Sequence, residues 1–452
     1  MLEIKIQSLL SILASKFIMK LSVVLFKGGT NFPGKIALRL DADILKTIAK
    51  NYEVILITGT NGKTTTTSMI YNMIQESGKD VITNNTGANL LPGIVSCLVQ
   101  NFRFKESTNE RYAVLEVDEA NLKLITAKID PYIITVTNLF RDQLDRFGEV
   151  YTTLNKILEG IENSPNSTLV LNGDESLLGD LGLNNPCIYF GFNAALDNNK
   201  IVDLNADAKF CKKCKSPYKY HFITYNHLGN FYCENCGYKR PDLDYSIDKI
   251  NEQSSEGSSM EIQNNEYYIN QPGTYNIYNG ICAYSIAKLL NIDNLVISNS
   301  LKSQKSSFGR QESVTINNKN VKIILVKNPA GFDEAINTVM LDKRKLSLAF
   351  ILNDNYADGR DVSWIWDVAF EKFTSLDISS VMVAGIRQSD MGVRLKIAGL
   401  NTNKFLLCQH YEELLSQIIN CDSQVVYVLA TYTAMISFRK HLHSKGYISK
   451  LW

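Results

Sequence analysis

The sequence predicts an α/β fold in which a phosphate-binding domain is followed by a second, smaller α/β domain. From about residue 53, short apolar runs alternate with segments of helical periodicity, as in a sheet covered by helices. A glycine-rich turn with a lysine directly follows the first run, and a second series of runs begins after residue 320. We therefore predict a basic helical segment over residues 1–50, a central domain over 51–304 and a C-terminal domain over 305–452.

The predicted elements follow this division. The expected strands of the central domain are Val54–Ile57, Tyr112–Val117, Ile133–Thr137 and Thr168–Leu171. The spacing of Ala and Ile predicts a helix over Asn276–Leu290, and the polar stretch Asn251–Ser259 predicts a surface loop. In the C-terminal domain, a second and smaller parallel sheet is expected from Val321–Val326, Leu346–Leu352, Ser380–Ala384 and Val425–Ala430.

The composition is that of folded domains. Of the 452 residues, 45% are hydrophobic and 21% are charged, which excludes a disordered, collagen-like or disulfide-scaffold chain. The formal net charge is +1, so no overall field would draw the protein onto nucleic acid. Residues 1–50, however, carry eight basic and three acidic side chains, a local excess of +5.

The first 26 residues are rich in Leu, Ile and Val, but Lys5, Lys16 and Lys20 interrupt the apolar stretch. No run there reaches the roughly 20 residues of a membrane span, and a secretory cleavage site is not evident. The pattern favours an amphipathic helix packed on the protein, with a helix lying on an anionic membrane surface as the alternative. We expect a cytoplasmic protein, with the inner face of the cell membrane as the alternative location.

Four of the nine cysteines stand in two C-x-x-C pairs with 18 residues between the pairs: Cys211, Cys214, Cys233 and Cys236. This spacing is typical of a zinc ribbon, because each turn presents two sulfurs to one tetrahedral ion and the intervening hairpin brings the pairs together. We predict a structural Zn²⁺ without an open coordination position, in an insertion at about residues 205–240. The alternatives are a pair of redox dithiols, or a ligand role for His221 or His227.

A glycine-rich turn joins the first predicted strand to a helix through Gly59, Thr60, Asn61, Gly62, Lys63, Thr64 and Thr65. Glycines let backbone N–H groups approach phosphate oxygens, and the helix N-terminus adds partial positive charge. We expect Lys63 to reach the β- and γ-phosphates of ATP and the Thr64 hydroxyl to ligate Mg²⁺. Only two residues separate the glycines, so the turn is a shortened variant of the standard phosphate loop. The chemistry expected of such a site is phosphoryl transfer.

Glu116 ends the predicted strand Tyr112–Val117 and is a candidate for a second Mg²⁺ contact. Carboxylates at the C-terminal ends of parallel strands lie over the crevice in which ligands bind. A solvated acid in a turn is the alternative interpretation.

The glycine turn is similar to the Gly-Thr-Asn-Gly-Lys-Thr-Thr signature of the Mur ligase and folylpolyglutamate synthetase superfamily. Four more segments resemble motifs of that family: Thr137–Asp145, Leu171–Glu175, Gly273–Asn279 and Gly309–Glu312. The resemblance implies a Mur-ligase-type central ATPase domain and a Rossmann-like C-terminal domain. It further implies that residues 59–65 and Asn138 bind ATP, that Asn276 and Asn279 approach adenine, and that Arg310 acts at the transferred phosphate.

Two departures from the family pattern narrow the set of family members that this chain resembles. The phosphate loop begins at residue 58, which leaves no room for the N-terminal UDP-binding domain of ordinary Mur ligases, so we expect that domain to be absent. The family's ribose-binding aspartate is replaced in the segment Ile324–Pro329.

One subgroup, the MurT subunits of lipid II isoglutaminyl synthase, is similar to this chain in its four-cysteine ribbon and in the segments Asn328–Gly331 and Asn353–Asp367. The resemblance implies a carbon–nitrogen ligase that uses ATP to amidate the α-carboxyl of D-glutamate in the lipid II stem peptide through an acyl phosphate. Ammonia would come from a GatD-type glutaminase in a heterodimer, and Asp361 would complete the Cys-His-Asp triad of that partner. A simple turn is the alternative for this Asp-rich segment.

Two rival functions follow from the same residues. A conventional amino-acid ligase of the same superfamily would act without a second protein. A nucleic-acid-binding ATPase is suggested by ribbon lysines such as Lys212 and Lys213, although the ribbon aromatics could equally fill a small core. We favour the amidating subunit and expect no nucleic-acid partner.

Overall fold

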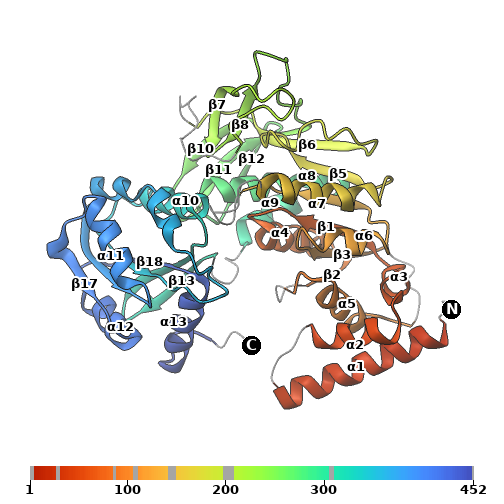
Figure 1. Ribbon diagram of the computed structural model, residues 1–452, viewed down its shortest axis with the longest axis horizontal. Coiled ribbons are helices and arrows are strands. Elements are labelled where there is room, and N and C mark those ends of the chain that lie inside the picture. The colour runs from red at the N-terminus through yellow and green to blue at the C-terminus, as the bar shows by residue number, and fades with distance from the viewer. Residues whose placement is uncertain are drawn as a thin grey trace.

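The computed structural model describes residues 5–26, 31–84, 88–104, 110–140, 149–196, 208–304 and 310–449. Figure 1 shows a larger body that contains the N-terminal helices and a smaller body at the C-terminal end, each built around its own sheet. The predicted α/β fold class is therefore confirmed.

The larger sheet contains seven parallel strands among the described residues, in the order β2-β3-β1-β4-β5-β6-β9. Its strands are β1 (Glu53–Thr58), β2 (Asp80–Thr83), β3 (Arg111–Glu116), β4 (Ile133–Val136), β5 (Thr168–Asn172), β6 (Cys187–Phe192) and β9 (Tyr245–Ile247). The four strands predicted for this domain are confirmed to within one residue at each end. The chain changes direction across the sheet at β1, so the loops after β1, β3 and β4 meet at one crevice.

Alternate residues of β1 enter two separate cores, because successive side chains of a strand point to opposite faces. Val54 and Leu56 pack among helices of one layer, and Ile55 and Ile57 pack among those of the other. The first layer contains α1 (Ile6–Phe26), α2 (Phe32–Leu40), α3 (Ile44–Ala49), α5 (Leu91–Gln100), α6 (Leu122–Thr126) and α7 (Glu149–Glu162). The second contains α4 (Lys63–Glu76), α8 (Thr274–Leu289) and α9 (Asn294–Ser303).

Two small antiparallel units extend this body at the top of Figure 1. One is the hairpin β7 (Lys219–Tyr225) and β8 (Leu228–Tyr232), and the other is the sheet β10 (Lys249–Gln253), β11 (Ser258–Ile262) and β12 (Asn265–Ile269). The predicted loop over Asn251–Ser259 is wrong, because most of that stretch belongs to β10 and β11. The polar side chains of β10 are largely exposed, so its pattern lacks the apolar alternation that marks a strand.

The second sheet has six strands within the described ranges, in the order β13-β14-β18-β15-β16-β17. They are β13 (Arg310–Ile316), β14 (Lys319–Leu325), β15 (Leu346–Ile351), β16 (Ile378–Ala384), β17 (Phe405–Leu407) and β18 (Val425–Ala430). The four predicted strands are present, and the pairing is parallel except for the edge strand β13, which runs antiparallel to β14. The sheet is covered by α10 (Pro329–Met340), α11 (Gln388–Ile397), α12 (Tyr411–Asn420), α13 (Tyr432–Ser444) and the 3₁₀ turns η1 (Ser363–Asp367), η2 (Phe370–Ser375) and η3 (Thr402–Lys404).

An ion-paired contact links the two bodies. Lys322, buried in β14, donates to the carbonyl of Ser255 at 2.7 Å and to Oε1 of Glu256 at 2.8 Å, both in the turn between β10 and β11. Arg344 lies 3.5 Å from the same Glu256 carboxylate. Beside this contact, residues of both bodies line a cavity of about 150 Å³.

Glu334 on α10 is a buried carboxyl in the second body. Burial raises the pKa of Glu334 to about 7, against a hydrogen bond that Asn337 Nδ2 donates at 2.7 Å and against the nearby charge of Lys372. The folded protein therefore binds an extra proton between the ordinary pKa of 4.5 and about 7. The stability that this proton contributes is present below that window and is lost as pH rises through it.

We predict that Glu334→Gln, a neutral isostere, raises the free energy of unfolding at about pH 8.5 by an amount on the order of 2 kcal/mol and changes it little at about pH 5. Denaturant titrations at both pH values measure this, with the exposed Glu162→Gln as the control. An equal effect of Glu334→Gln at the two pH values would contradict the prediction.

Candidate functional site

The turn between β1 and α4 requires both of its glycines. Gly59 has φ +120° and Gly62 has φ +84°, values that L side chains rarely adopt. A Cβ atom at Gly59 would lie 2.4 Å from Oγ1 of Thr137, and one at Gly62 would lie 2.1 Å from Oδ1 of Asn279. The turn is thus pressed against the end of β4 and against α8, and larger residues would displace it.

Asn138 holds the middle of this turn. Its Oδ1 accepts from the backbone N–H of Asn61 at 2.9 Å, and its Nδ2 donates to the Asn61 carbonyl at 3.1 Å. The Asn138 carbonyl accepts from the N–H of Thr60 at 2.9 Å, and the Thr137 hydroxyl donates to the Asn61 carbonyl at 2.7 Å. The side chain that the resemblance assigned to ATP binding therefore fixes the conformation of the phosphate loop.

Lys63 begins α4, and its ammonium group turns back over the loop. Its Nζ donates to the Gly59 carbonyl, to the Thr60 carbonyl at 3.3 Å and to Oε1 of Glu119 at 2.9 Å. Glu119 belongs to the acidic stretch after β3, and sequence reasoning gave it no role. The ion pair keeps the cation beside the backbone amides of the turn.

Thr64 and Glu116, the two predicted Mg²⁺ contacts, lie together. The Thr64 hydroxyl donates to Oε2 of Glu116 at 2.7 Å, and Asn89 Nδ2 donates to Oε1 at 3.2 Å. Glu116 is almost fully buried, and its own N–H donates to Oδ1 of Asn84 at 2.9 Å. A hydroxyl and a carboxylate are the oxygen ligands that Mg²⁺ prefers, so these residues fit the ion. Asn84 was missed because it follows β2, a short strand that the sequence did not reveal.

Some of the remaining residues predicted to bind ATP also lie beside the glycine turn. Thr66, just after the loop, donates to Oδ1 of Asn279 at 3.2 Å, and Nδ2 of Asn279 donates to Asn276 at 3.2 Å. Thr65 is buried at the start of α4. Arg310 begins β13, but its side chain, like Gly309 and residues 141–145 of the Thr137–Asp145 motif, lies outside the described residues.

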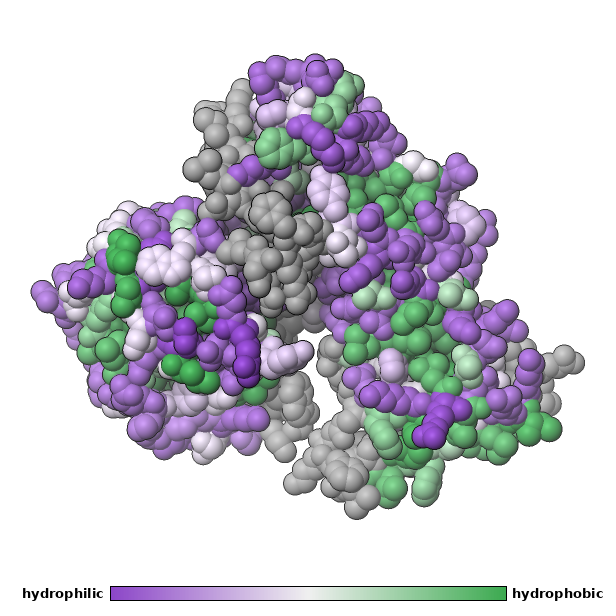
Figure 2. All heavy atoms as spheres, viewed as in Figure 1, coloured by the Kyte–Doolittle hydropathy of each residue, from purple (hydrophilic) through white to green (hydrophobic). Residues whose placement is uncertain are grey.

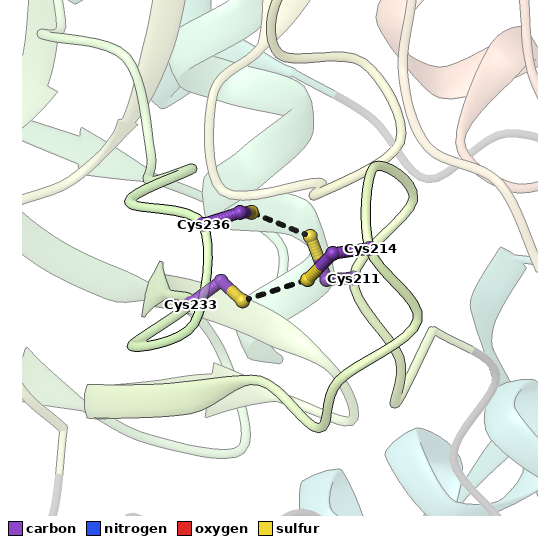
Figure 3. Close-up of side chains that lie close together, drawn as sticks. All are labelled: Cys211, Cys214, Cys233 and Cys236. Atoms are coloured by element: carbon purple, nitrogen blue, oxygen red, sulfur yellow. Dashed lines mark hydrogen bonds between the residues drawn. The ribbon is translucent and has the colours of Figure 1, made fainter.

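The four ribbon cysteines converge from the two ends of the β7–β8 hairpin (Figure 3). Their sulfurs all lie within 4.8 Å of one another, with Cys211 to Cys236 at 3.5 Å and Cys214 to Cys233 at 3.4 Å. A tetrahedral zinc with bonds of about 2.3 Å requires sulfur–sulfur separations of about 3.8 Å. The four thiols therefore fit one zinc ion, which would hold the hairpin ends together as a structural ligand set.

The histidine alternative does not hold. His227 is buried, and its Nε2 lies 2.8 Å from Oε2 of Glu175, while the His221 ring stacks on Tyr232. Neither belongs to the cysteine cluster. The ribbon aromatics do fill a small core, formed with two of the cysteines by Tyr218, Tyr220, Ile223, Phe231 and Tyr238.

Basic residues of the ribbon attach it to the central domain. Lys212 Nζ donates to the carbonyls of Leu177 at 3.2 Å and Asp180 at 2.9 Å, and Arg240 NH1 donates to Oδ1 of Asp174 at 2.9 Å. These cations have intramolecular partners, which removes part of the basic surface on which the nucleic-acid alternative depended.

Asp361 lies in the loop after β15, at the C-terminal edge of the second sheet. Its carboxylate is exposed and accepts from the N–H of Ser363 at 2.8 Å and from the Ser363 hydroxyl at 2.9 Å, at the start of η1. Asp358 anchors the same loop, because it accepts from the N–H of Thr433 at 2.7 Å. Trp364 is buried in the core, whereas Trp366 is half-exposed.

Comparison with known proteins identifies relatives of both bodies. A family model described as the Mur ligase middle domain matches residues 57–238, and one described as MurT ligase C-terminal matches residues 325–435. The chain is 42% identical to the lipid II isoglutaminyl synthase (glutamine-hydrolyzing) subunit MurT of Streptococcus pneumoniae, over 93% of this chain and 94% of that protein. It is 32% identical to the MurT subunit of Staphylococcus aureus strain COL, over 85% and 86%.

Solved structures share the fold at lower identity. A pseudomurein peptide ligase type C from Methanothermus fervidus aligns with a TM-score of 0.67 and 21% identity, covering 89% of this chain and 80% of that one. MurF from Thermotoga maritima, solved in complex with ADP, aligns with a TM-score of 0.60 and 13% identity, covering 90% and 85%.

We predict that Cys211→Ser abolishes stoichiometric zinc binding and lowers the melting temperature, because metal binding contributes folding energy to small ribbons. Metal analysis of the purified protein and thermal unfolding measure the two effects. Cys421→Ser, a half-buried cysteine outside the ribbon, is the control. A zinc-free protein with an unchanged melting temperature would argue against a structural metal.

Proposed function

The chain belongs to the Mur ligase family and, within it, to the MurT subunits of lipid II isoglutaminyl synthase, and on this basis we propose that it amidates lipid II with ATP. The reaction converts the α-carboxyl of D-glutamate in the stem peptide to the amide of D-isoglutamine. Beyond the family relationship, the observation that carries the proposal is the cluster of Lys63, Thr64 and Glu116 around a glycine turn. Such a cluster suits phosphoryl transfer to a carboxylate.

The first step forms an acyl phosphate. A carboxylate oxygen of the substrate attacks the γ-phosphorus of ATP, the bond to the bridging oxygen breaks, and ADP leaves. Backbone N–H groups of Gly62 and Lys63, at the start of α4, and the Lys63 ammonium bind the β- and γ-phosphates, so a phosphate oxygen replaces Glu119 as a partner of Nζ. Thr64 and Glu116 are the residues that would hold Mg²⁺, and the ion would supply positive charge against the negative charge of the phosphates.

The second step displaces the phosphate. Ammonia attacks the acyl carbon, inorganic phosphate leaves, and the attacking nitrogen loses a proton to give the neutral amide. Asn276 and Asn279 border the loop on the side of α8 and are assigned to the nucleotide base. Arg310, at the start of β13 where the two bodies join, is assigned to the transferred phosphate.

Ammonia is supplied by a separate GatD-type glutaminase that docks on the C-terminal body. Asp361 suits a role in that partner's triad, because its exposed carboxylate is already oriented by Ser363 and could fix and charge-stabilise a facing imidazole. The same body carries exposed apolar side chains that suit a protein interface: Trp366, Ile386, Val393, Ile397 and Leu407. We place the reaction in the cytoplasm, at the inner face of the membrane that carries lipid II.

We predict that Lys63→Ala lowers ATP turnover and amidation by about 100- to 1,000-fold, because the loop loses the cation that stabilises the transferring phosphate. ADP release in the presence of lipid II, Mg²⁺ and glutaminase measures this. Lys156→Ala, an exposed lysine on α7, is the control. Near-normal turnover with a normal melting temperature would remove the phosphate-loop assignment.

We predict that Asp361→Asn spares amidation driven by ammonium chloride and lowers amidation driven by glutamine by about 100-fold or more, because only the partner's triad is impaired. The two nitrogen sources are compared with the same purified heterodimer. Asp377→Asn, an exposed aspartate of the same body, should affect neither. Equal losses with both sources would assign Asp361 to the synthase reaction or to folding.

A further inference from the structure

The N-terminal helix α1 is packed with its polar side inward. Ser8 donates to Oδ2 of Asp41 at 2.6 Å, Ser11 donates to the Ala37 carbonyl at 2.9 Å, and Ser15 donates to the Pro33 carbonyl at 2.9 Å. All three serines are buried against α2 and the loop that follows it. Short hydroxyl side chains let the two helices approach closely, and Ile12 is the one large apolar side chain among residues 5–21 that is fully buried in the core.

Five other large apolar residues of α1 face outward. Their exposed fractions lie between 44% and 78%, and their positions are Ile6, Leu10, Leu13, Phe17 and Leu21. At 3.6 residues per turn, these five directions fall within about 80° of the helix circumference, and the serines lie on the opposite side. Figure 2 shows hydrophobic residues along the edge of the molecule where α1 lies in Figure 1. The helix predicted from the sequence is therefore present, but it packs on the protein through three serines and Ile12, while five of its large apolar residues face outward.

Cations border this apolar stripe. Lys5, Lys16 and Lys20 fall along one edge of it on the same helical wheel, and the 21 residues of α1 include no acidic side chain. Lys16 also reaches the Phe102 carbonyl at 2.8 Å, which leaves its side chain along the protein surface. Lys35 and Arg39 on the adjoining α2 are exposed as well. An apolar stripe flanked by cations complements an anionic lipid surface, which offers acyl chains beneath negative headgroups.

The dimensions indicate a helix that lies on a membrane. At 1.5 Å per residue, α1 is about 31 Å long, but its serine side is occupied by α2. Among the helices that the structure describes, none is long and apolar enough to cross a bilayer. A flat orientation leaves the stripe free to enter the boundary between headgroups and acyl chains.

We propose that the outer face of α1, the stripe of five apolar residues with its flanking lysines, docks this protein onto an anionic lipid bilayer. The inference rests on the proposed function in one respect, since a lipid-linked substrate requires the enzyme to work at a membrane surface. A second protein is the weaker candidate for this face, because the surface proposed above for the glutaminase lies on the C-terminal body, away from α1 in Figure 1.

The test uses the full-length protein with vesicles of phosphatidylglycerol and phosphatidylcholine, and with vesicles of phosphatidylcholine alone. Co-sedimentation should show binding to the anionic vesicles that weakens with added salt. Leu10→Gln combined with Phe17→Gln should lower the partition coefficient by about tenfold or more. Lys5→Gln combined with Lys20→Gln should lower binding to anionic vesicles selectively.

The matched control is Leu124→Gln combined with Leu295→Gln. These leucines are 46% and 68% exposed on α6 and α9, against 59% and 67% for Leu10 and Phe17. The control pair should bind vesicles like the unaltered chain, and thermal unfolding shows whether each variant is folded.

Binding of the α1 variant at the unaltered level, or no binding by the unaltered chain, overturns the proposal. A concentration-dependent dimer that the α1 variant abolishes, without vesicle binding, would assign the face to a second copy. Loss of glutaminase association in that variant, again without vesicle binding, would assign it to the partner.

Because vesicle binding needs no substrate, its failure leaves the proposed amidation untouched. Amidation of detergent-solubilised lipid II by the α1 variant tests that function separately, and it should proceed at the unaltered rate.

Discussion

The bonds between Asn138 and the backbone of Asn61 are the constraint on which the candidate active site depends. A glycine-rich turn is conformationally free in isolation, and its amides point at a phosphate only if the surrounding structure fixes them. Asn138 satisfies both the N–H and the carbonyl of Asn61, while Thr137 and Asn279 close the space around the two glycines. Because Lys63 follows the turn directly, the position of its ammonium group is set by the same contacts.

A buried polar cluster connects this loop to the zinc ribbon. Glu175 accepts from the N–H of Leu139, next to Asn138, and contacts His227 in the ribbon hairpin. Neighbouring Asp174 accepts from Tyr278 on α8 and from Arg240 beyond the ribbon, at 2.7 Å and 2.9 Å. Burial raises the pKa of Asp174, while the Arg240 charge opposes that shift. The ribbon is thus linked through Glu175 to the segment that holds the glycine turn and through Asp174 to α8.

Elements whose structure depends on residues close together along the chain could be predicted well. The strand, glycine turn and helix over residues 53–76 form one continuous signal, and the two C-x-x-C pairs have their spacing because each turn must present two sulfurs. Asn84 and Asn89 could not be found in this way, because they follow a four-residue strand and bond the backbone and the side chain of Glu116 on β3. The strands β10 and β11 were missed for a related reason, since cross-strand pairing rather than an apolar pattern forms them.

The sequence by itself determined the α/β class, the order of the two sheets, the glycine turn between a strand and a helix, and the two pairs of cysteines, because each depends on local spacing or periodicity. Only the tertiary structure decided which side of α1 is buried, that Thr64 meets Glu116, and that Glu119 pairs with Lys63. These are contacts between segments 30 to 60 residues apart, and the pattern of neither segment indicates which other segment it contacts. An amphipathic helix in particular has two faces, and the choice between them depends on what the rest of the fold presents.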